Sequence, residues 1–218
     1  MTSASDNVSQ TLFCSGAFII WYSIAVLVNH LPYIDTLKSQ GLLMPLTCLL
    51  EFIALVAFYR GYSLRFTDIA LGTLRTRQVL LFSVLLLATI GSQSWYLRPE
   101  SWTLSQTGYS QLGLISFCLA VVILAPVFEE ILFRGFILHA FLLWAPAQRL
   151  TCSIVTSLFF ALLHTQYAHL QTLISLTVLS LLLCAARLIS GGLKLPIYLH
   201  MLNNFFGVAP LLWQNVVR

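Results

Sequence analysis

Long apolar runs, separated by short polar or Gly/Pro-containing segments, dominate this chain. The length of these runs and the polar, Gly and Pro residues between them predict helical segments over residues 12–28, 42–59, 79–90, 112–128, 136–144, 154–163, 170–182 and 195–213. A transmembrane helix needs roughly 20 predominantly apolar residues, and several of these runs approach that length. The pattern therefore predicts an all-α fold, a polytopic transmembrane helical bundle of about seven to eight helices.

The composition supports a chain that is solvated by lipid rather than by water. Only 8% of the 218 residues are charged, 59% are hydrophobic, and the mean hydropathy is +0.89. A soluble domain carries about 25% charged residues, because its surface has to stay hydrated. We therefore expect a multi-pass integral membrane protein with no separate soluble domain.

The net charge of +4 does not indicate a nucleic-acid-binding protein, because its positive residues form no compact patch. Four arginines instead share one loop: Arg60, Arg65, Arg75 and Arg77. Loops rich in Lys and Arg face the cytoplasm, so this loop and the N-terminus are expected on the cytoplasmic side. The polar stretch over residues 91–111 then lies outside. It carries the aromatic residues typical of a membrane interface: Trp95, Tyr96, Trp102 and Tyr109.

A few ionisable side chains interrupt the apolar runs, and each is a candidate for function, since a charge at mid-bilayer costs from about 2.5 kcal/mol upwards. They are Glu51, Glu129, Glu130, Arg134, His139, His164 and His200, with Asn203 and Asn204 as polar companions. We expect Glu51 to pair with an arginine or to face an internal cavity, and His139 to lie at the interface.

The paired glutamates divide into two roles if this segment is helical. Glu130 and Arg134 are four residues apart, so they share a helical face and can form a self-neutralising ion pair. Glu129 points about 100° away, so it lacks that partner and is free to face a cavity as a general base. The competing interpretation is a buried ionic cluster without chemistry. The pair is expected towards the cytoplasmic end of its span.

Two further segments carry donor or acid/base groups. His164 ends the run over residues 154–163, where an interfacial side chain is the alternative interpretation. His200 and Asn204 share one helical face, where they would either join helices together or stabilise a developing oxyanion. Two histidines and a glutamate also match the ligands of some catalytic zinc sites, but the H-E-x-x-H spacing of soluble metalloproteases is absent.

In order and spacing, these three motifs resemble the CPBP family of intramembrane proteases, which includes CaaX prenyl endopeptidases and bacteriocin-processing enzymes. The family pattern is E-E-x-x-x-R, then F-x-x-x-H, then H-x-x-x-N. Here it is Glu129-Glu130 with Arg134, Phe160 with His164, and His200 with Asn204. The resemblance covers residues 112–206. It implies N-terminal transmembrane helices over residues 1–111 and a catalytic core with an intramembrane cavity over residues 112–218, in one integrated membrane domain.

The resemblance also implies a role for each motif residue. Glu129 would activate water with help from His164, while His200 and Asn204 would stabilise the oxyanion. Glu130, Arg134 and Phe160 would support the site. No cofactor is expected, because Asn204 is a poor zinc ligand and a general-base glutamate needs no ion; if the enzyme is metal-dependent, Glu129, His164 and His200 would be the ligands.

The implied function is hydrolysis of a peptide bond near the membrane interface. The expected partners are the bilayer and a membrane-associated protein or peptide, such as a peptide precursor or a C-terminal tail. The short chain with compact loops favours the bacterial cytoplasmic (inner) membrane. The alternative is a non-catalytic membrane scaffold or bacteriocin-immunity protein with the same fold.

Overall fold

The computed structural model describes residues 4–102 and 110–216, and every regular element in these ranges is helical. The elements are α1 (Ala4–Val28), α2 (Ile34–Ser39), α3 (Leu43–Arg65), α4 (Thr76–Gln93), α6 (Gln111–Leu119), η2 (Ala120–Leu124), α7 (Ala125–Glu130), η3 (Ile131–Ile137), α8 (Leu138–Trp144), α9 (Arg149–Leu162), α10 (Leu170–Ser190) and α11 (Lys194–Val216). Among the aromatic interface residues predicted above, Tyr109 lies outside the described ranges.

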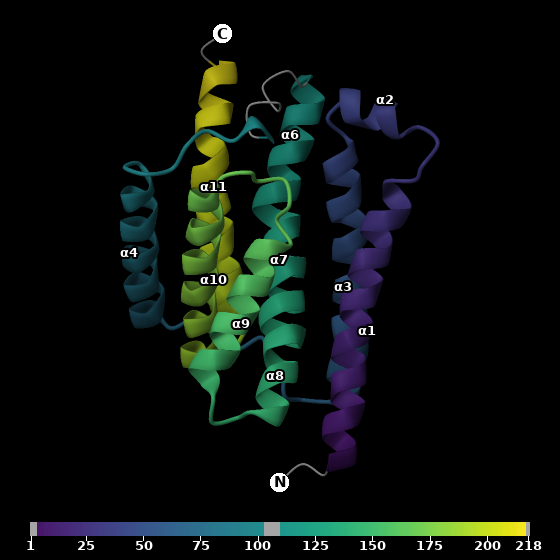
Figure 1. Ribbon diagram of the computed structural model, residues 1–218, viewed down its shortest axis with the longest axis vertical. Helices are drawn as coiled ribbons and strands as arrows, with labels where there is room; N and C mark the ends of the chain where they lie inside the picture. Colours follow the sequence, from purple (N-terminus) through teal and green to yellow (C-terminus); the bar gives the residue numbers. More distant parts are fainter. Residues whose placement is uncertain (1–3, 103–109, 217–218) are drawn as a thin grey trace.

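Within the described residues, six helical stretches are long and apolar enough to cross a membrane. They run roughly parallel or antiparallel (Figure 1), with α1 and α3 along one side and α4 along the other. The stretch from α6 to α8, together with α10 and α11, fills the space between them. The polytopic helical bundle that the sequence predicts is therefore confirmed.

One continuous helical stretch, residues 111–144, replaces the two segments expected over 112–128 and 136–144. It contains 34 residues and runs unbroken from α6 through η2, α7 and η3 to α8. The charged residues between the two apolar runs do not interrupt it, because Arg134 is neutralised by Glu130 one turn earlier. Glu129 and Glu130 consequently lie near the middle of a long helix, not towards the end of a span as the sequence suggested.

Two π-helical segments, η2 and η3, flank the glutamate pair. In η2 the Ala125 N–H bonds to the Ala120 carbonyl, five residues back. Pro126 follows and has no N–H to donate. The Val121 carbonyl therefore lacks both of its usual intrahelical donors, and the side-chain amide of Asn204 donates to it at 2.9 Å. Short π-helical segments often occur at functional sites. Here η2 provides the carbonyl through which Asn204 bonds α11 to the central helix.

The start of α11 is fixed by the loop that follows α3. The backbone N–H groups of Leu193 and Lys194 donate to the carbonyls of Ala70 and Leu71, at 3.2 and 2.9 Å. Gly192 packs directly against this loop, where an added Cβ would lie 2.4 Å from the Gly72 Cα. Since α11 carries His200, this backbone contact helps to set the position of a candidate site residue.

Replacing Gly192 with alanine is therefore expected to destabilise the protein by about 1–3 kcal/mol, as overpacking against rigid backbone does. The measurement is thermal unfolding of the purified protein in detergent. Gly61→Ala is the matched control, because nothing lies within 4 Å of a Cβ at that position. Equal melting temperatures for the two variants would contradict the tight contact.

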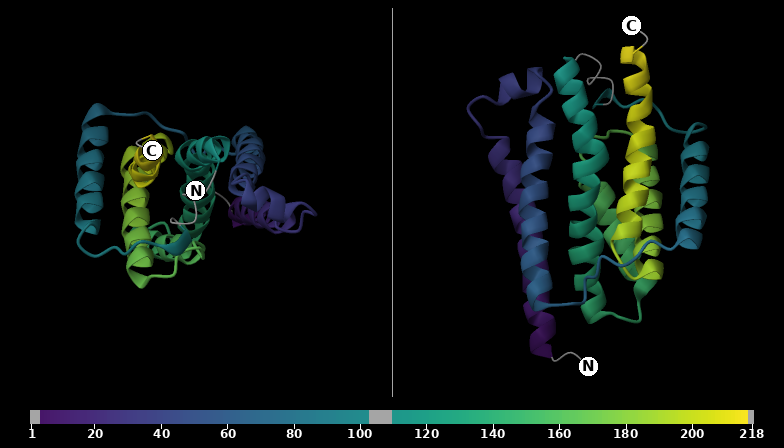
Figure 2. Two further views of the ribbon diagram at one scale, coloured as in Figure 1. Left: turned by 90° about the horizontal axis from the view of Figure 1, so that it is seen from above. Right: turned by 180° about the vertical axis from the view of Figure 1, so that it is seen from behind.

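The two ends of the bundle differ in charge. The N-terminus and the loop after α3 lie at one end, while the C-terminus lies at the other (Figures 1 and 2). Most Lys and Arg residues belong to segments at the N-terminal end: Arg60, Arg65, Arg75, Arg77, Arg149, Arg187 and Lys194. We call this the basic end of the bundle.

Candidate active site

A cavity of about 410 Å³ contains all three motifs of the sequence analysis. Its lining includes Glu129 from α7, Phe160 and His164 from α9 and the loop after it, and His200 and Asn204 from α11. Residues that are up to 75 positions apart in the chain thus share one space. The predicted motif residues are therefore brought together within the helical bundle.

Glu130 is the centre of a buried polar network. It is fully buried, and its Oε1 accepts from Arg134 Nη1 at 2.8 Å and from His200 Nδ1 at 2.7 Å. Arg134 also donates to the Ser180 hydroxyl at 2.8 Å and to the Ser180 carbonyl at 3.3 Å. The ion pair between Glu130 and Arg134 that the helical spacing suggests is present, and it extends to α10 and α11.

Glu129 lies on the other side of His200. Its Oε2 is 3.8 Å from His200 Nε2, its side chain is 18% exposed, and this oxygen has no hydrogen-bond partner. Because Glu130 accepts the Nδ1 hydrogen of His200, the Nε2 atom is directed to Glu129. Helical spacing within α11 relates His200 to Asn204 alone, and it carries no information about this contact of His200 with both glutamates of α7.

His164 and Phe160 form an aromatic contact beside this network. His164 Nδ1 donates to the Phe160 carbonyl at 2.7 Å, so its Nε2 is left as an acceptor. The Phe160 ring is fully buried and lies 4.7 Å from the Arg134 guanidinium carbon and 4.4 Å from the His164 ring. Phe160 therefore supports the positions of the catalytic candidates through packing.

Asn204 is held by hydrogen bonds to two other groups. It donates to the Val121 carbonyl and accepts from Asn203 Nδ2 at 3.1 Å. One amide hydrogen of Asn204 therefore bonds α11 to the central helix, as the helix-joining interpretation predicts. An amide has two, so one N–H remains for the cavity that Asn204 lines.

The residues do not assemble the alternative zinc site. Across the described parts of the chain, no three His, Cys, Asp or Glu side chains are grouped as metal ligands. We therefore derive no step that passes through a metal.

Two other ionisable residues lie outside the lining of this cavity. Glu51 of α3 is buried and hydrogen-bonded to Trp21, and no arginine of the described residues pairs with it. His139 of α8 contacts Gln10 Oε1 at 2.7 Å and the Tyr62 hydroxyl at 3.1 Å, which joins three helices. Neither residue lines the cavity of the three motifs.

Two aromatic residues and Glu100 also belong to the lining of this cavity. Trp102 packs edge-on against Tyr167, whose ring is parallel to His164 at 6.2 Å. Burial raises the pKa of Tyr167 to about 12, so its hydroxyl keeps its proton at neutral pH. Tyr167 lies in a loop without a motif, so no pattern in the sequence indicates its position beside His164.

Glu100 links this loop to α10. Its carboxylate accepts from the Thr172 hydroxyl at 2.6 Å and from the backbone N–H groups of Ala168 and His169, at 3.1 and 3.2 Å. These bonds, the one from Thr172 first, lower the pKa of Glu100. An anion at the start of α10 also interacts favourably with the helix dipole. No local spacing in the sequence reveals this contact, since its partners are about 70 positions away.

Glu100→Gln is expected to lower the melting temperature at neutral pH, because an amide cannot replace the three bonds of the anion. The folded-state pKa is depressed, so this stabilisation is present above the ordinary glutamate pKa of about 4.3 and is lost as the pH falls through the lower folded value. Melting curves of both proteins between pH 7 and pH 3 should therefore converge at the acid end. A constant difference would contradict the assignment.

Comparisons with known proteins agree with these motifs. Residues 111–206 match the Rce1-like family, described as type II CAAX prenyl endopeptidase Rce1-like. A protein of Escherichia coli described as an uncharacterized 24.3 kDa protein is 43% identical over 96 residues, which cover 41% of this chain and 42% of that relative. No solved structure matches the chain significantly.

The matched segment contains Glu129, Glu130, His164, His200 and the helices that hold them. The resemblance predicted from the motifs is therefore confirmed for this segment: residues 111–206, somewhat less than half of the chain, match the Rce1-like family of CAAX prenyl endopeptidases.

Proposed function

We propose that this protein is an intramembrane endopeptidase in which Glu129 and His164 activate water, while His200 and Asn204 stabilise the oxyanion. The observation that carries this proposal is the chain of contacts from Arg134 through Glu130 and His200 to Glu129, which borders a cavity inside a membrane-spanning bundle. A partnerless carboxylate oxygen beside an oriented histidine is the arrangement that general-base catalysis requires.

In the proposed reaction, Glu129 Oε2 removes a proton from a water molecule while the water oxygen attacks the carbonyl carbon of the peptide bond. His164 assists through Nε2, which is free to accept from the same water. The C–N bond then breaks, and the proton held by Glu129 passes to the leaving nitrogen. A new carboxyl group and a new amino group are the products.

His200 is proposed to stabilise the oxyanion of the tetrahedral intermediate. Its Nδ1 hydrogen is held by Glu130, so Nε2 donates to the oxyanion when the ring is protonated. Asn204 would add its second amide hydrogen. A preorganised donor of this kind typically contributes about 10²–10³ in rate.

The proposed substrate is a membrane-associated protein or peptide, such as a peptide precursor or a C-terminal tail, cleaved near the membrane interface. The cavity volume of about 410 Å³ falls in the usual range of ligand sites, roughly 300–1,000 Å³. We place the protein in a bacterial cytoplasmic membrane with its N-terminus in the cytoplasm, because the basic end of the bundle should face inwards.

Dialysis against a strong zinc chelator is expected to leave peptide hydrolysis unchanged, since no step of the proposed mechanism uses a metal. The measurement is the cleavage rate of the purified protein before and after dialysis, together with its zinc content. Stoichiometric zinc with activity that is lost on chelation and restored by zinc would replace the metal-free mechanism.

The alternative is a non-catalytic scaffold or immunity protein, and an activity test distinguishes it from a peptidase. Such a protein would keep its cellular phenotype when Glu129, His164 or His200 is replaced, provided that it still folds. A peptidase would lose the phenotype and the cleavage products together.

A further inference from the structure

A second cavity, of about 260 Å³, is lined by segments of the basic end of the bundle and shares no lining residue with the cavity of the three motifs. Its lining comes from the loop after α3, from η3 and α8, from the segment that leads into α9, and from the last turn of α10. Its volume is several times the roughly 30 Å³ that one water molecule occupies. The cavity therefore has room for a small polyatomic ion or for a headgroup.

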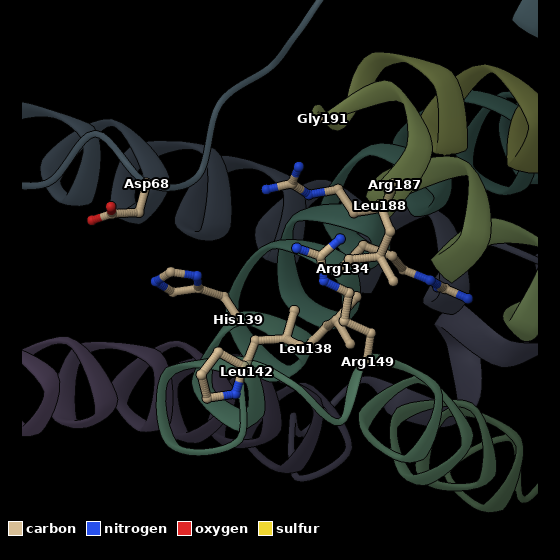
Figure 3. Close-up of a pocket in the computed structure, with 10 residues that line it drawn as sticks. Asp68, Arg134, Leu138, His139, Leu142, Arg149, Arg187, Leu188 and Gly191 are labelled. Carbon is tan, nitrogen blue, oxygen red and sulfur yellow. The ribbon is translucent and has the colours of Figure 1, made fainter. Parts of the chain in front are cut away.

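Positive charge dominates the lining. Arg134, Arg149 and Arg187 border the cavity, and Asp68 is its only carboxylate among the described residues. Figure 3 shows the side chains of Arg149 and Arg187 reaching into this space, with Asp68 across from them. Arg134 is neutralised by Glu130, so two arginines face one carboxylate and the cavity keeps a net positive charge.

Neither Arg149 nor Arg187 forms an ion pair with a described carboxylate. The Nε of Arg187 is buried without a hydrogen-bond partner, as is the Nε of the fully buried Arg134. Buried donors are nearly always bonded, because an unpaired one costs about 1–3 kcal/mol. Two unpaired arginines at one cavity, one of which has a buried donor without a partner, indicate a missing acceptor.

Arg149 provides a second argument for an anion. It is the first residue of α9, where the helix dipole already presents partial positive charge. A cation at this end is unfavourable unless an anion binds beside it. Guanidinium groups bind the oxygens of phosphate with two hydrogen bonds each, and a tetrahedral phosphate can engage several of them together.

We propose that this cavity binds a phosphate group through Arg149 and Arg187. Two sources share this chemistry, namely the headgroup of an anionic phospholipid and free inorganic phosphate. Basic pockets between helices at the cytoplasmic surface bind phospholipid headgroups in membrane proteins. The apolar side chains of Leu138, Leu142 and Leu188 in the same lining would contact the glycerol end of a lipid.

Arg134 connects this cavity with the catalytic candidates. Its Nη1 holds Glu130, and Arg134 is also one of the residues that line the phosphate cavity. A bound phosphate would therefore help to fix the side chain that positions Glu130. The binding site itself does not depend on the proposed peptidase function.

The test measures the melting temperature of the purified full-length protein in a non-ionic detergent, titrated with three probes. These are inorganic phosphate, a short-chain phosphatidylglycerol, and a diacylglycerol of the same chain length without phosphate. We expect a phosphate-bearing probe to raise the melting temperature in a saturable way and the diacylglycerol to have no such effect. Stabilisation by inorganic phosphate assigns the free ion as the source, and stabilisation by phosphatidylglycerol alone assigns the lipid.

Matched variants test the assigned residues. Arg149→Gln and Arg187→Gln should each raise the half-saturating concentration about tenfold, the loss expected for one charge-assisted contact. Asp68→Asn should lower it several-fold. Arg77→Gln removes the same charge at the same end of the bundle outside the cavity, so it should have no effect.

Arg149 is exposed, so its variant keeps the fold even if Arg187→Gln does not. Equal weakening by Arg77→Gln, equal stabilisation by diacylglycerol, or no stabilisation by either phosphate-bearing probe would overturn the proposal. Binding is measured here instead of cleavage, so the result is independent of the peptidase assignment.

Discussion

Replacing Glu129 with glutamine is expected to lower the rate of peptide hydrolysis by at least about 10²–10⁴-fold, the usual contribution of a positioned general base. The amide fits the same space and cannot accept a proton from water. Because Glu129 Oε2 has no partner in the structure, the substitution breaks no observed hydrogen bond at this atom and should leave the melting temperature nearly unchanged. The measurement is cleavage of a membrane-associated peptide library, read by mass spectrometry.

Glu51→Gln is the matched control for this prediction. Glu51 is also a buried glutamate in a membrane-spanning helix, and it does not line the cavity of the three motifs. The control variant is expected to retain the wild-type rate. A Glu129→Gln protein that still cleaves at the wild-type rate would remove Glu129 from the mechanism.

Glu130→Gln is expected to reduce both stability and activity. Removing one partner of a buried ion pair leaves the other charge uncompensated, which typically costs about 3–5 kcal/mol. Arg134 is 1% exposed and has no second carboxylate, so it meets this condition. His200 would also lose the acceptor of its Nδ1 hydrogen. The measurement pairs thermal unfolding with the cleavage assay.

A double variant separates the two losses. In Glu130→Gln with Arg134→Met the isolated charge is gone, so much of the stability should return, as in other buried pairs replaced by apolar groups. Activity should stay low, because His200 is still without its carboxylate. Recovery of activity together with stability would show that Glu130 serves the fold alone.

Much of the site follows from spacing within single helices. The four-residue separation of Glu130 and Arg134 predicts their ion pair, and the structure contains it. The same geometry separates Glu129 from that pair. Contacts between helices do not follow from such spacing. Spacing along α7 or α11 cannot show that His200 bonds to Glu130, or that Asn204 bonds to the Val121 carbonyl.

Backbone irregularity explains a second group of differences. The apolar runs predict two segments, over residues 112–128 and 136–144, since charges between apolar runs are read as an interruption. The structure continues through it, because a neutralised arginine need not leave the bundle interior. Likewise, the acceptor for Asn204 exists because η2 and Pro126 leave Val121 without an intrahelical donor, and hydrophobic pattern alone does not reveal a π-helical segment.

Two contacts at the ends of the bundle were also missed. Glu100 reaches α10 from a polar loop, and Arg149 and Arg187 converge from different helices. Each side chain is unremarkable by itself in the sequence. Their significance depends on which loops meet, and this is fixed by the packing of the whole bundle.

The most direct test of the account compares the protein termini of membranes from cells that express the wild-type chain with those from cells that express Glu129→Gln at equal levels. New N- and C-termini should be found with the wild type, in matched pairs at one peptide bond, and should be missing with the variant. Identical sets of termini in the two membranes, while both proteins are folded and abundant, would contradict a peptidase centred on Glu129.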